Sequence, residues 1–287
     1  MEKTLLSFGH GFSARALARL LLPRGWRVIG TTRSEEKASR LLSEGVESRI
    51  WPGADMGPAL DAATHVLVSA APGAEGDPVL GTLRGEIAAR AGQFDWVGYL
   101  STTGVYGDHD GDWVDEATPL NPATARGQAR VAAEAAWSAI PGLPLHIFRL
   151  AGIYGPGRGP FAKVRDGTAR RIIKPGQVFS RTHVDDIAQV LLASIDRPRP
   201  GGVYNVCDDD PAPPEDVIEE AARLLGLPVP QAEDFETAEM TPMARSFYSE
   251  SKKVRNDLIK SELGVTLRYP DYRAGLRALL AEEERGE

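Results

Sequence analysis

The residues Gly9–Ala14 read Gly-His-Gly-Phe-Ser-Ala, which is the G-x-G-x-x-G/A spacing of a loop that binds the phosphates of a dinucleotide. An apolar run ending at Phe8 precedes this loop, and apolar residues at helical spacing follow it from Ala16 onward. The context is therefore that of a strand, a tight turn and a helix. The residues expected to line such a site are Gly9, His10, Gly11 and Phe12.

Each small residue of the loop has a separate physical purpose. Gly9 makes the tight turn, Gly11 lets the backbone approach a pyrophosphate, and Ala14 lets the helix pack closely on the sheet. The phosphates would rest on the helix amino terminus, where unpaired N–H groups and the helix dipole favour negative charge. A glycine turn with a purely structural purpose is the alternative.

The end of the second expected strand indicates which dinucleotide would bind. An acidic residue there holds the ribose hydroxyls of NAD, whereas an arginine accommodates the 2′-phosphate of NADP. This chain has Thr32, Arg33 and Ser34, with no carboxylate before Glu35. A charge-assisted hydrogen bond contributes roughly 1.5–3 kcal/mol, so one phosphate contact could favour NADP by about 10- to 100-fold. We predict NADP, the alternative being that Arg33 faces solvent.

Composition excludes several classes of protein. The 287 residues are 42% hydrophobic and 25% charged, as in an ordinary globular protein, and the net charge of −7 argues against sequence-independent nucleic-acid binding. With Cys207 as the single cysteine, no intrachain disulfide or cysteine-based zinc site can form. No run approaches the roughly 18 apolar residues that span a bilayer. We expect a cytoplasmic protein without a membrane partner.

Strand and helix patterns alternate over about the first 205 residues, which predicts an α/β fold with a doubly wound parallel sheet of the NAD(P)-binding Rossmann type. The tail differs, because it reads as helices separated by proline-rich Leu227–Pro230. We predict a dinucleotide-binding domain over 1–205, with an excursion near 160–182, and a small, mostly helical lobe over 206–287. The site is expected in the cleft between them. Expected strands are Thr4–Ser7, Arg27–Thr31, Glu47–Ile50, His65–Val68, Trp96–Leu100, Leu145–Leu150 and Val203–Asn205; expected helices in the tail are Pro214–Leu225, Ser251–Leu263 and Tyr269–Glu284.

Three separated motifs occur along the chain: Leu100–Asp108 closes the fifth expected strand, Arg149–Arg158 closes the sixth, and Thr182–Ala188 follows further on. Together they resemble the extended branch of the short-chain dehydrogenase/reductase superfamily, and in particular the NAD-dependent epimerase/dehydratase proteins. The resemblance covers nearly the whole chain, since Gly202–Val206 and Tyr269–Leu276 are similar to recurring features of an atypical, poorly characterised subgroup.

The resemblance implies a catalytic arrangement that this chain only partly has. In the superfamily a serine or threonine after the fifth strand hydrogen-bonds the reacting oxygen, and a Tyr-x-x-x-Lys pair on the next helix moves the proton. Thr102 matches the hydroxyl, but Arg126 and Arg130 stand where the tyrosine and lysine are expected. Arginine stays protonated and cannot act as an acid or base here. Losing such a group costs about 10²–10⁴ in rate.

Other side chains are weaker candidates for the proton relay. Tyr106 is the tyrosine nearest to Thr102, and Tyr154 follows the next strand; each reads more readily as a packed or ribose-facing aromatic. Tyr154 is also a candidate for substrate binding. His183 reads as ordering a turn before a helix. The acidic pair that sugar dehydratases have after the threonine is absent, because Thr103 and Gly104 stand there. Elimination by that route is disfavoured.

Arg126 and Arg130 lie four residues apart on one helical face, so they could bind an anionic substrate or a second phosphate. A solvated face is the alternative. The run Asp208–Asp210 reads as solvated carboxylates or a helix cap, so no metal is expected. Ser101 lacks a nucleophile-elbow pattern. Ser251–Asn256 reads as a charged helix face.

Two hypotheses follow. The first is an NADP-dependent oxidoreductase or epimerase acting on a small hydroxyl or carbonyl compound, which could be a nucleotide sugar. The second is a catalytically inactive NADP-binding sensor or regulatory module. A small, anionic ligand is expected in both, and a homodimer is common in the superfamily although no residue here specifies one. In the first hypothesis the ribose and nicotinamide would lie beside Ser69, Ala70, Ala71 and Pro72.

Overall fold

The computed structural model describes residues 2–286, apart from the side chain of Met243. Seven parallel strands form one sheet in the order β11-β7-β5-β4-β1-β2-β3. The strand order reverses between β1 and β4, as expected for a doubly wound sheet. The strands are β1 (Thr4–Phe8), β2 (Arg27–Thr32), β3 (Glu47–Ile50), β4 (His65–Val68), β5 (Trp96–Thr102), β7 (Leu145–Leu150) and β11 (Val203–Val206), which confirms the predicted sheet.

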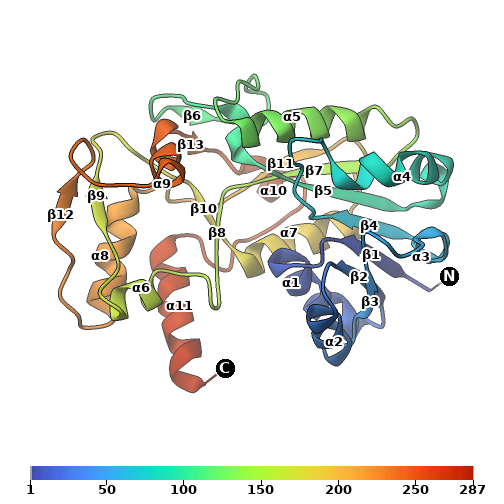
Figure 1. Cartoon of the computed structure of the whole chain (residues 1–287), viewed down its shortest axis with the longest axis horizontal. Helices are drawn as coiled ribbons and strands as arrows, with labels where there is room; N and C mark the ends of the chain where they lie inside the picture. The colour runs from blue at the N-terminus through green and yellow to red at the C-terminus, as the bar shows by residue number, and fades with distance from the viewer. Residues whose placement is uncertain (1, 287) are drawn as a thin grey trace.

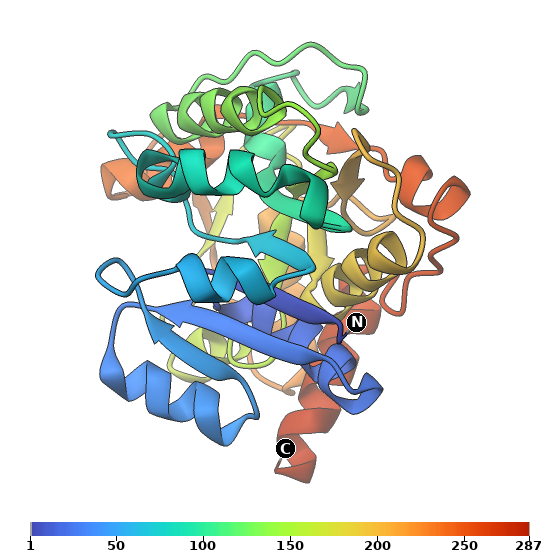
Figure 2. The same ribbon diagram turned by 90° about the vertical axis from the view of Figure 1, so that its right-hand side faces the viewer.

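Helices cover both faces of this sheet because successive side chains of each strand point to opposite faces (Figure 1). Leu5 belongs to a core shared with one set of helices, whereas Leu6 belongs to the core of the other. The first set is α1 (Phe12–Leu21), α2 (Glu35–Ser43), α7 (Val184–Asp196) and α10 (Asp257–Ser261). The second is α3 (Gly57–Ala62), α4 (Pro78–Ala89) and α5 (Ala125–Ser138). The two layers are also visible in the rotated view of Figure 2.

A smaller lobe lies to one side of the sheet (Figure 1). Its core includes Tyr154, Phe161, Ala221 and Leu276, which come from widely separated parts of the chain. Strand β12 pairs with β9, so the segment near 160–182 lies with the C-terminal residues. The lobe elements are β8 (Gly152–Tyr154), α6 (Phe161–Arg165), β9 (Arg171–Ile173), β10 (Arg181–His183), α8 (Pro214–Leu224), β12 (Ala232–Asp234), α9 (Pro242–Ser246) and α11 (Tyr272–Arg285).

The chain then returns from the lobe to the sheet. Strand β13 (Lys253–Val254) pairs with β6 (Trp113–Val114), and Ile259 of α10 is fully buried in the core beside α1 and α7. The predicted helix over Ser251–Leu263 is therefore wrong for its first six residues, because Lys253 donates a backbone hydrogen bond to Asp112 and forms a strand. The predicted division at residue 205 stays a prediction.

Four 3₁₀ turns complete the structure: η1 (Leu22–Arg24), η2 (Ala91–Gln93), η3 (Thr103–Tyr106) and η4 (Phe247–Ser249). Within residues 2–286, no helix combines the length and apolar character that crossing a bilayer requires.

Candidate active site

The glycine loop lies against the loop that follows β4. Gly9 has φ +75°, and its N–H donates to Oγ1 of Thr31 over 2.8 Å. A Cβ on Gly9 would lie 2.8 Å from the backbone nitrogen of Ala70, which is closer than real Cβ atoms approach. Both the conformation and the contact therefore require glycine at this position.

The amino terminus of α1 differs from those of neighbouring helices. Gly11 precedes α1 and provides no side-chain cap, and the first turn contains no acidic residue. In contrast, Ser34 caps α2 and Thr124 caps α5 through their side chains. The uncapped N–H groups of α1 therefore fit the pyrophosphate of a dinucleotide, because they need an external acceptor.

Arg33 extends from the end of β2 with an exposed side chain. Among the residues that the structure describes, no carboxylate or aromatic ring pairs with its guanidinium. Oγ of Ser34 accepts a hydrogen bond from the backbone of Lys37 at 3.4 Å, which leaves the hydroxyl hydrogen of Ser34 free to donate. Thr32 supports this turn, since its Oγ1 is 3.5 Å from the nitrogen of Ser34. An anion at this corner would meet two free donor side chains.

His10 points into the protein and packs on β2. Its side chain is 7% exposed, and a Cβ on Gly30 would lie 2.7 Å from its ring. Burial lowers the pKa of His10 to about 4, so the ring is neutral at physiological pH. Neither ring nitrogen has a partner among the described residues. His10 therefore supplies no charge to the cofactor site predicted from the sequence.

The loop Ser69–Pro72 follows β4, which neighbours β1 where the strand order reverses. The backbone nitrogens of Ser69 and Ala70 both donate to the carbonyl of Phe8, over 2.8 and 3.1 Å. Ala71 is exposed, and Pro72 is half-buried. These residues therefore lie at the carboxyl ends of β1 and β4, where open α/β sheets bind their ligands.

Thr102 ends β5 and lies opposite Leu150 of β7. Its Oγ1 accepts a hydrogen bond of 3.2 Å from the nitrogen of Gly104, so it caps η3. The hydroxyl hydrogen remains free to donate to a bound oxygen. A Cβ on Gly127 would lie 2.7 Å from the carbonyl oxygen of Gly104, which shows how closely α5 approaches this turn.

The two arginines of α5 have different surroundings. Arg130 donates to the backbone carbonyl of Leu100, and its Nη1 lies 3.4 Å from the hydroxyl of Tyr99. Arg126 is exposed and holds its guanidinium carbon 5.2 Å from the ring centre of Phe247, in the lobe. Arg130 is therefore engaged by the backbone of β5, whereas Arg126 is exposed and contacts the lobe through Phe247.

Tyr106 is fully buried. A catalytic tyrosine would have to be exposed to the substrate. Its hydroxyl donates to Oδ1 of Asn205 over 2.7 Å and accepts from Arg149 over 3.0 Å. Arg149 in turn pairs with buried Glu134. Burial raises the pKa of Tyr106. This placement corrects the sequence-based assignment, because the hydroxyl already has partners and no substrate can reach it.

Tyr154 also lies in a core, with 8% of its side chain exposed. A Cβ on Gly275 would lie 2.0 Å from its hydroxyl oxygen, so the ring extends toward α11 and not toward the glycine loop. Burial raises the pKa of Tyr154 far above its usual range. His183 caps α7 by accepting from the nitrogen of Asp185 over 3.2 Å, which confirms its predicted function in the turn.

Arg158 is the last residue of the motif Arg149–Arg158, but the sequence did not predict that it would lie beside the glycine loop. Backbone hydrogen bonds between Gly155 and Arg158 close a tight turn, and a Cβ on Gly155 would lie 3.0 Å from the ring of Phe12. The guanidinium carbon of Arg158 lies 5.8 Å from the centre of that ring, at the first residue of α1. The side chain is exposed and has no carboxylate partner among the described residues. The lobe therefore places a free cation beside the uncapped helix end.

The three aspartates after β11 have three different environments. Asp208 is 2% exposed, and neither of its carboxyl oxygens has a hydrogen-bond partner among the described residues. Asp209 pairs with Lys260 over 2.5 Å, and Asp210 pairs with Arg273 over 2.5 Å. They are therefore not simply solvated. Within residues 2–286, no group of three or more His, Cys, Asp or Glu side chains is arranged to hold a metal ion.

Comparison with known proteins gives the family and the fold of this chain. Residues 8–207 match the NAD dependent epimerase/dehydratase family, and the chain belongs to that family. Protein YeeZ of Escherichia coli (strain K12) is 29% identical over 283 residues, which cover 94% of this chain and 97% of YeeZ. A solved structure of a functionally unknown conserved protein from Silicibacter pomeroyi DSS is 65% identical, covers 98% of this chain and 99% of that one, and has a TM-score of 0.95. The human epimerase family protein SDR39U1 with NADPH has the same fold at 18% identity, with coverages of 97% and 99% and a TM-score of 0.75.

Proposed function

We propose that this family member binds NADP and acts as an oxidoreductase or epimerase on a small hydroxyl or carbonyl compound. The observation that carries the proposal is the free guanidinium of Arg33 after β2, the strand that is hydrogen-bonded through Thr31 to the glycine loop before the uncapped helix α1. Arg33 and Ser34 would bind the 2′-phosphate, while the N–H groups after Gly11 would bind the pyrophosphate. SDR39U1, which shares the fold, was solved with NADPH.

Arg158 extends this proposed cofactor site. Its guanidinium lies over Phe12, the residue whose N–H begins α1, and no acidic side chain among the described residues competes for it. We assign Arg158 to the pyrophosphate, which NAD and NADP share. Arg33 would then select between the two dinucleotides, whereas Arg158 would strengthen the binding of both.

The chain's own residues limit the chemistry at the reacting atoms. When bound, the nicotinamide would supply or accept a hydride. Thr102 would donate a hydrogen bond to the reacting oxygen, because its Oγ1 already accepts from Gly104 and keeps its hydrogen free. Arg126 would hold an anionic group of the substrate, since its side chain is exposed beside Phe247. Neither residue can accept the proton in the manner of the superfamily's tyrosine.

A specific observation favours the alternative, a catalytically inactive NADP-binding sensor or regulatory module. The tyrosine and lysine positions hold Arg126 and Arg130, and Arg130 is bound to the carbonyl of Leu100. Tyr106 and Tyr154 are buried and turned to other partners. Among the described residues, the hydroxyl of Thr102 has no hydrogen bond to another side chain.

Fluorescence titration with NADPH and NADH tests the cofactor proposal. We expect Arg33→Ala to weaken NADPH binding by about 10- to 100-fold and to leave NADH unchanged, because only NADPH carries the 2′-phosphate. Arg158→Ala should weaken both by about tenfold. Arg40→Ala, an exposed arginine of α2, is the matched control and should change neither. Equal NADPH affinity in Arg33→Ala and the wild type would contradict the NADP assignment.

A turnover screen separates the two functions. Carbonyl compounds and nucleotide sugars are offered with the cofactor that binds, and absorbance of the reduced nicotinamide is followed. Turnover supports the oxidoreductase or epimerase, whereas tight binding without turnover supports the regulatory module. Failure of both NADPH and NADH to bind would reject both functions.

A further inference from the structure

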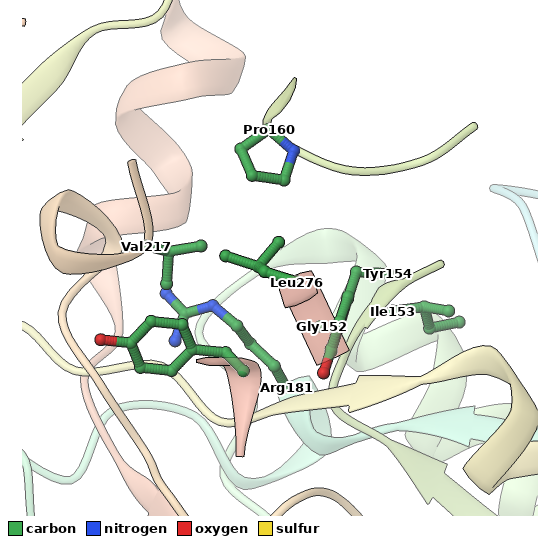
Figure 3. A pocket seen from close by; sticks show the side chains of 8 residues that line it. Gly152, Ile153, Tyr154, Pro160, Arg181, Val217 and Leu276 are labelled. Carbon is green, nitrogen blue, oxygen red and sulfur yellow. The ribbon is translucent and has the colours of Figure 1, made fainter. Parts of the chain in front are cut away.

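The lobe contains a cavity of about 220 Å³ that the glycine loop does not line. Its lining residues come from β8, β10, α8, α11 and the residue before α6, and their side chains are drawn in Figure 3. The lining side chains are apolar except for one guanidinium and two tyrosine hydroxyls. The lining residues are Gly152, Ile153, Tyr154, Pro160, Arg181, Val217, Tyr272 and Leu276.

Arg181 brings a positive charge into this apolar surrounding. Figure 3 shows its guanidinium lying near Val217 and Leu276. Nη1 donates to the backbone carbonyls of Phe179 and Ala212, over 3.0 and 2.9 Å. An arginine has five N–H donors, so Nε and Nη2 keep the remaining ones. Among the described residues, none accepts a hydrogen bond from them.

No negative charge in the described chain compensates Arg181 directly. Asp208 is the carboxyl group with the largest electrostatic effect on it, but no ion pair joins the two side chains. Burial raises the pKa of Asp208 to about 8, so this carboxyl is mostly protonated at neutral pH. Asp210, the other nearby carboxylate, is paired with Arg273. A buried charge without a partner is costly, and an anionic ligand would remove that cost.

We propose that this cavity binds a small organic carboxylate with an apolar body, whose carboxylate accepts hydrogen bonds from Nε and Nη2 of Arg181. The planar edge of a guanidinium matches a carboxylate in a two-point contact. The apolar body would lie against Val217, Leu276 and Tyr272, where its burial is favourable. The site is separate from the proposed dinucleotide cleft and does not depend on it.

Isothermal titration of the full chain with sodium benzoate tests the site, with benzamide as the neutral analogue of the same shape. We expect benzoate to bind saturably and to raise the unfolding temperature. Benzamide should bind at least about tenfold more weakly, because it cannot form the charge-assisted pair. Benzoate binding that does not saturate, or that equals benzamide binding, would overturn the proposal.

One substitution removes the positive charge of Arg181, and a second fills the space inside the cavity. Arg181→Met keeps the length of the side chain without its charge, and Val217→Phe fills the cavity from α8, where Val217 is half-buried. Each should weaken benzoate binding by at least about tenfold. Arg277→Met is the matched control, because Arg277 is an exposed arginine of α11 that does not line the cavity.

The outcomes remain separable from those of the cofactor experiment. Circular dichroism and the unfolding temperature report whether each variant folds, and NADPH titration reports on the dinucleotide cleft. If Arg181→Met does not fold, Val217→Phe decides the question, and unchanged benzoate affinity in that variant rejects the site. Loss of benzoate binding in Arg277→Met to the same extent as in Arg181→Met would also reject it.

Discussion

The glycine loop and the β5–α5 edge belong to the same expected active site but keep their polar groups in different states. At the loop, the N–H groups of α1 are uncapped, and the cations Arg33 and Arg158 have no carboxylate partner among the described residues. At the β5–α5 edge, Arg130 is bound to a backbone carbonyl, and Thr102 already caps a turn. The loop thus keeps its polar groups without protein partners, whereas much of the second region stabilises its own fold.

Substitution of Thr102 is expected to have the largest effect, which is on kcat. It also tests the difference between the two regions most directly. If the protein turns over a substrate, Thr102→Val should lower kcat by about 10²–10³, since a donor to the reacting oxygen is lost. NADPH affinity should not change. Steady-state kinetics on a substrate found in the screen measure this, with Thr103→Val, the adjacent half-buried threonine, as control. Unchanged kcat would remove Thr102 from the catalytic residues.

Gly9→Ala tests the loop side of the comparison. A non-glycine residue with positive φ costs roughly 1–2 kcal/mol, and the contact with Ala70 adds to that cost. We expect a lower unfolding temperature together with loss of NADPH binding. In Gly11→Ala the new Cβ meets only the carbonyl oxygen of Gly9, at 3.6 Å, which is an ordinary contact. That variant should fold normally but bind NADPH more weakly; equal stability losses would contradict this distinction.

Arg130→Met gives the smallest effect and sharpens the interpretation of α5. Because Arg130 is tied to Leu100, its loss should lower the free energy of unfolding by about 1–2 kcal/mol. NADPH affinity should stay within about twofold of the wild type. Urea unfolding and fluorescence titration measure the two quantities, and Arg126→Met, on the exposed side, should leave stability unchanged. A large loss of NADPH affinity in Arg130→Met would instead give Arg130 the place of the superfamily's lysine at the cofactor.

Sequence patterns predicted the sheet well because strand and helix periodicity is local. The glycine loop was predicted for the same reason, since Gly9 and Gly11 and the helix they precede lie within a few residues. Contacts between distant segments could not be predicted in this way. The hydroxyl of Tyr106 is bonded to Asn205, and the ring of Phe12 lies beside Arg158. Both pairs are brought together only by the folded sheet and lobe.

Charge state was equally hidden from the sequence. His10 stands in the loop motif, yet its ring is buried against Gly30 and neutral at physiological pH. The segment Ser251–Asn256 has the charged residues of an exposed helix. Its backbone instead forms a strand pair, because the nitrogen of Lys253 donates to the carbonyl of Asp112. In each case tertiary contacts outweighed the local pattern.

The return of residues 253–267 to the sheet has a mechanical consequence. The chain leaves the sheet for the lobe after β7. The strand pair β13–β6 and the buried Ile259 attach it to the sheet domain again. A lobe held at several separated points cannot swing open about a single hinge. Ligand entry must therefore proceed by small sliding movements of packed segments or by movement of individual loops, and removing the C-terminal residues would expose the core of the sheet as well as that of the lobe.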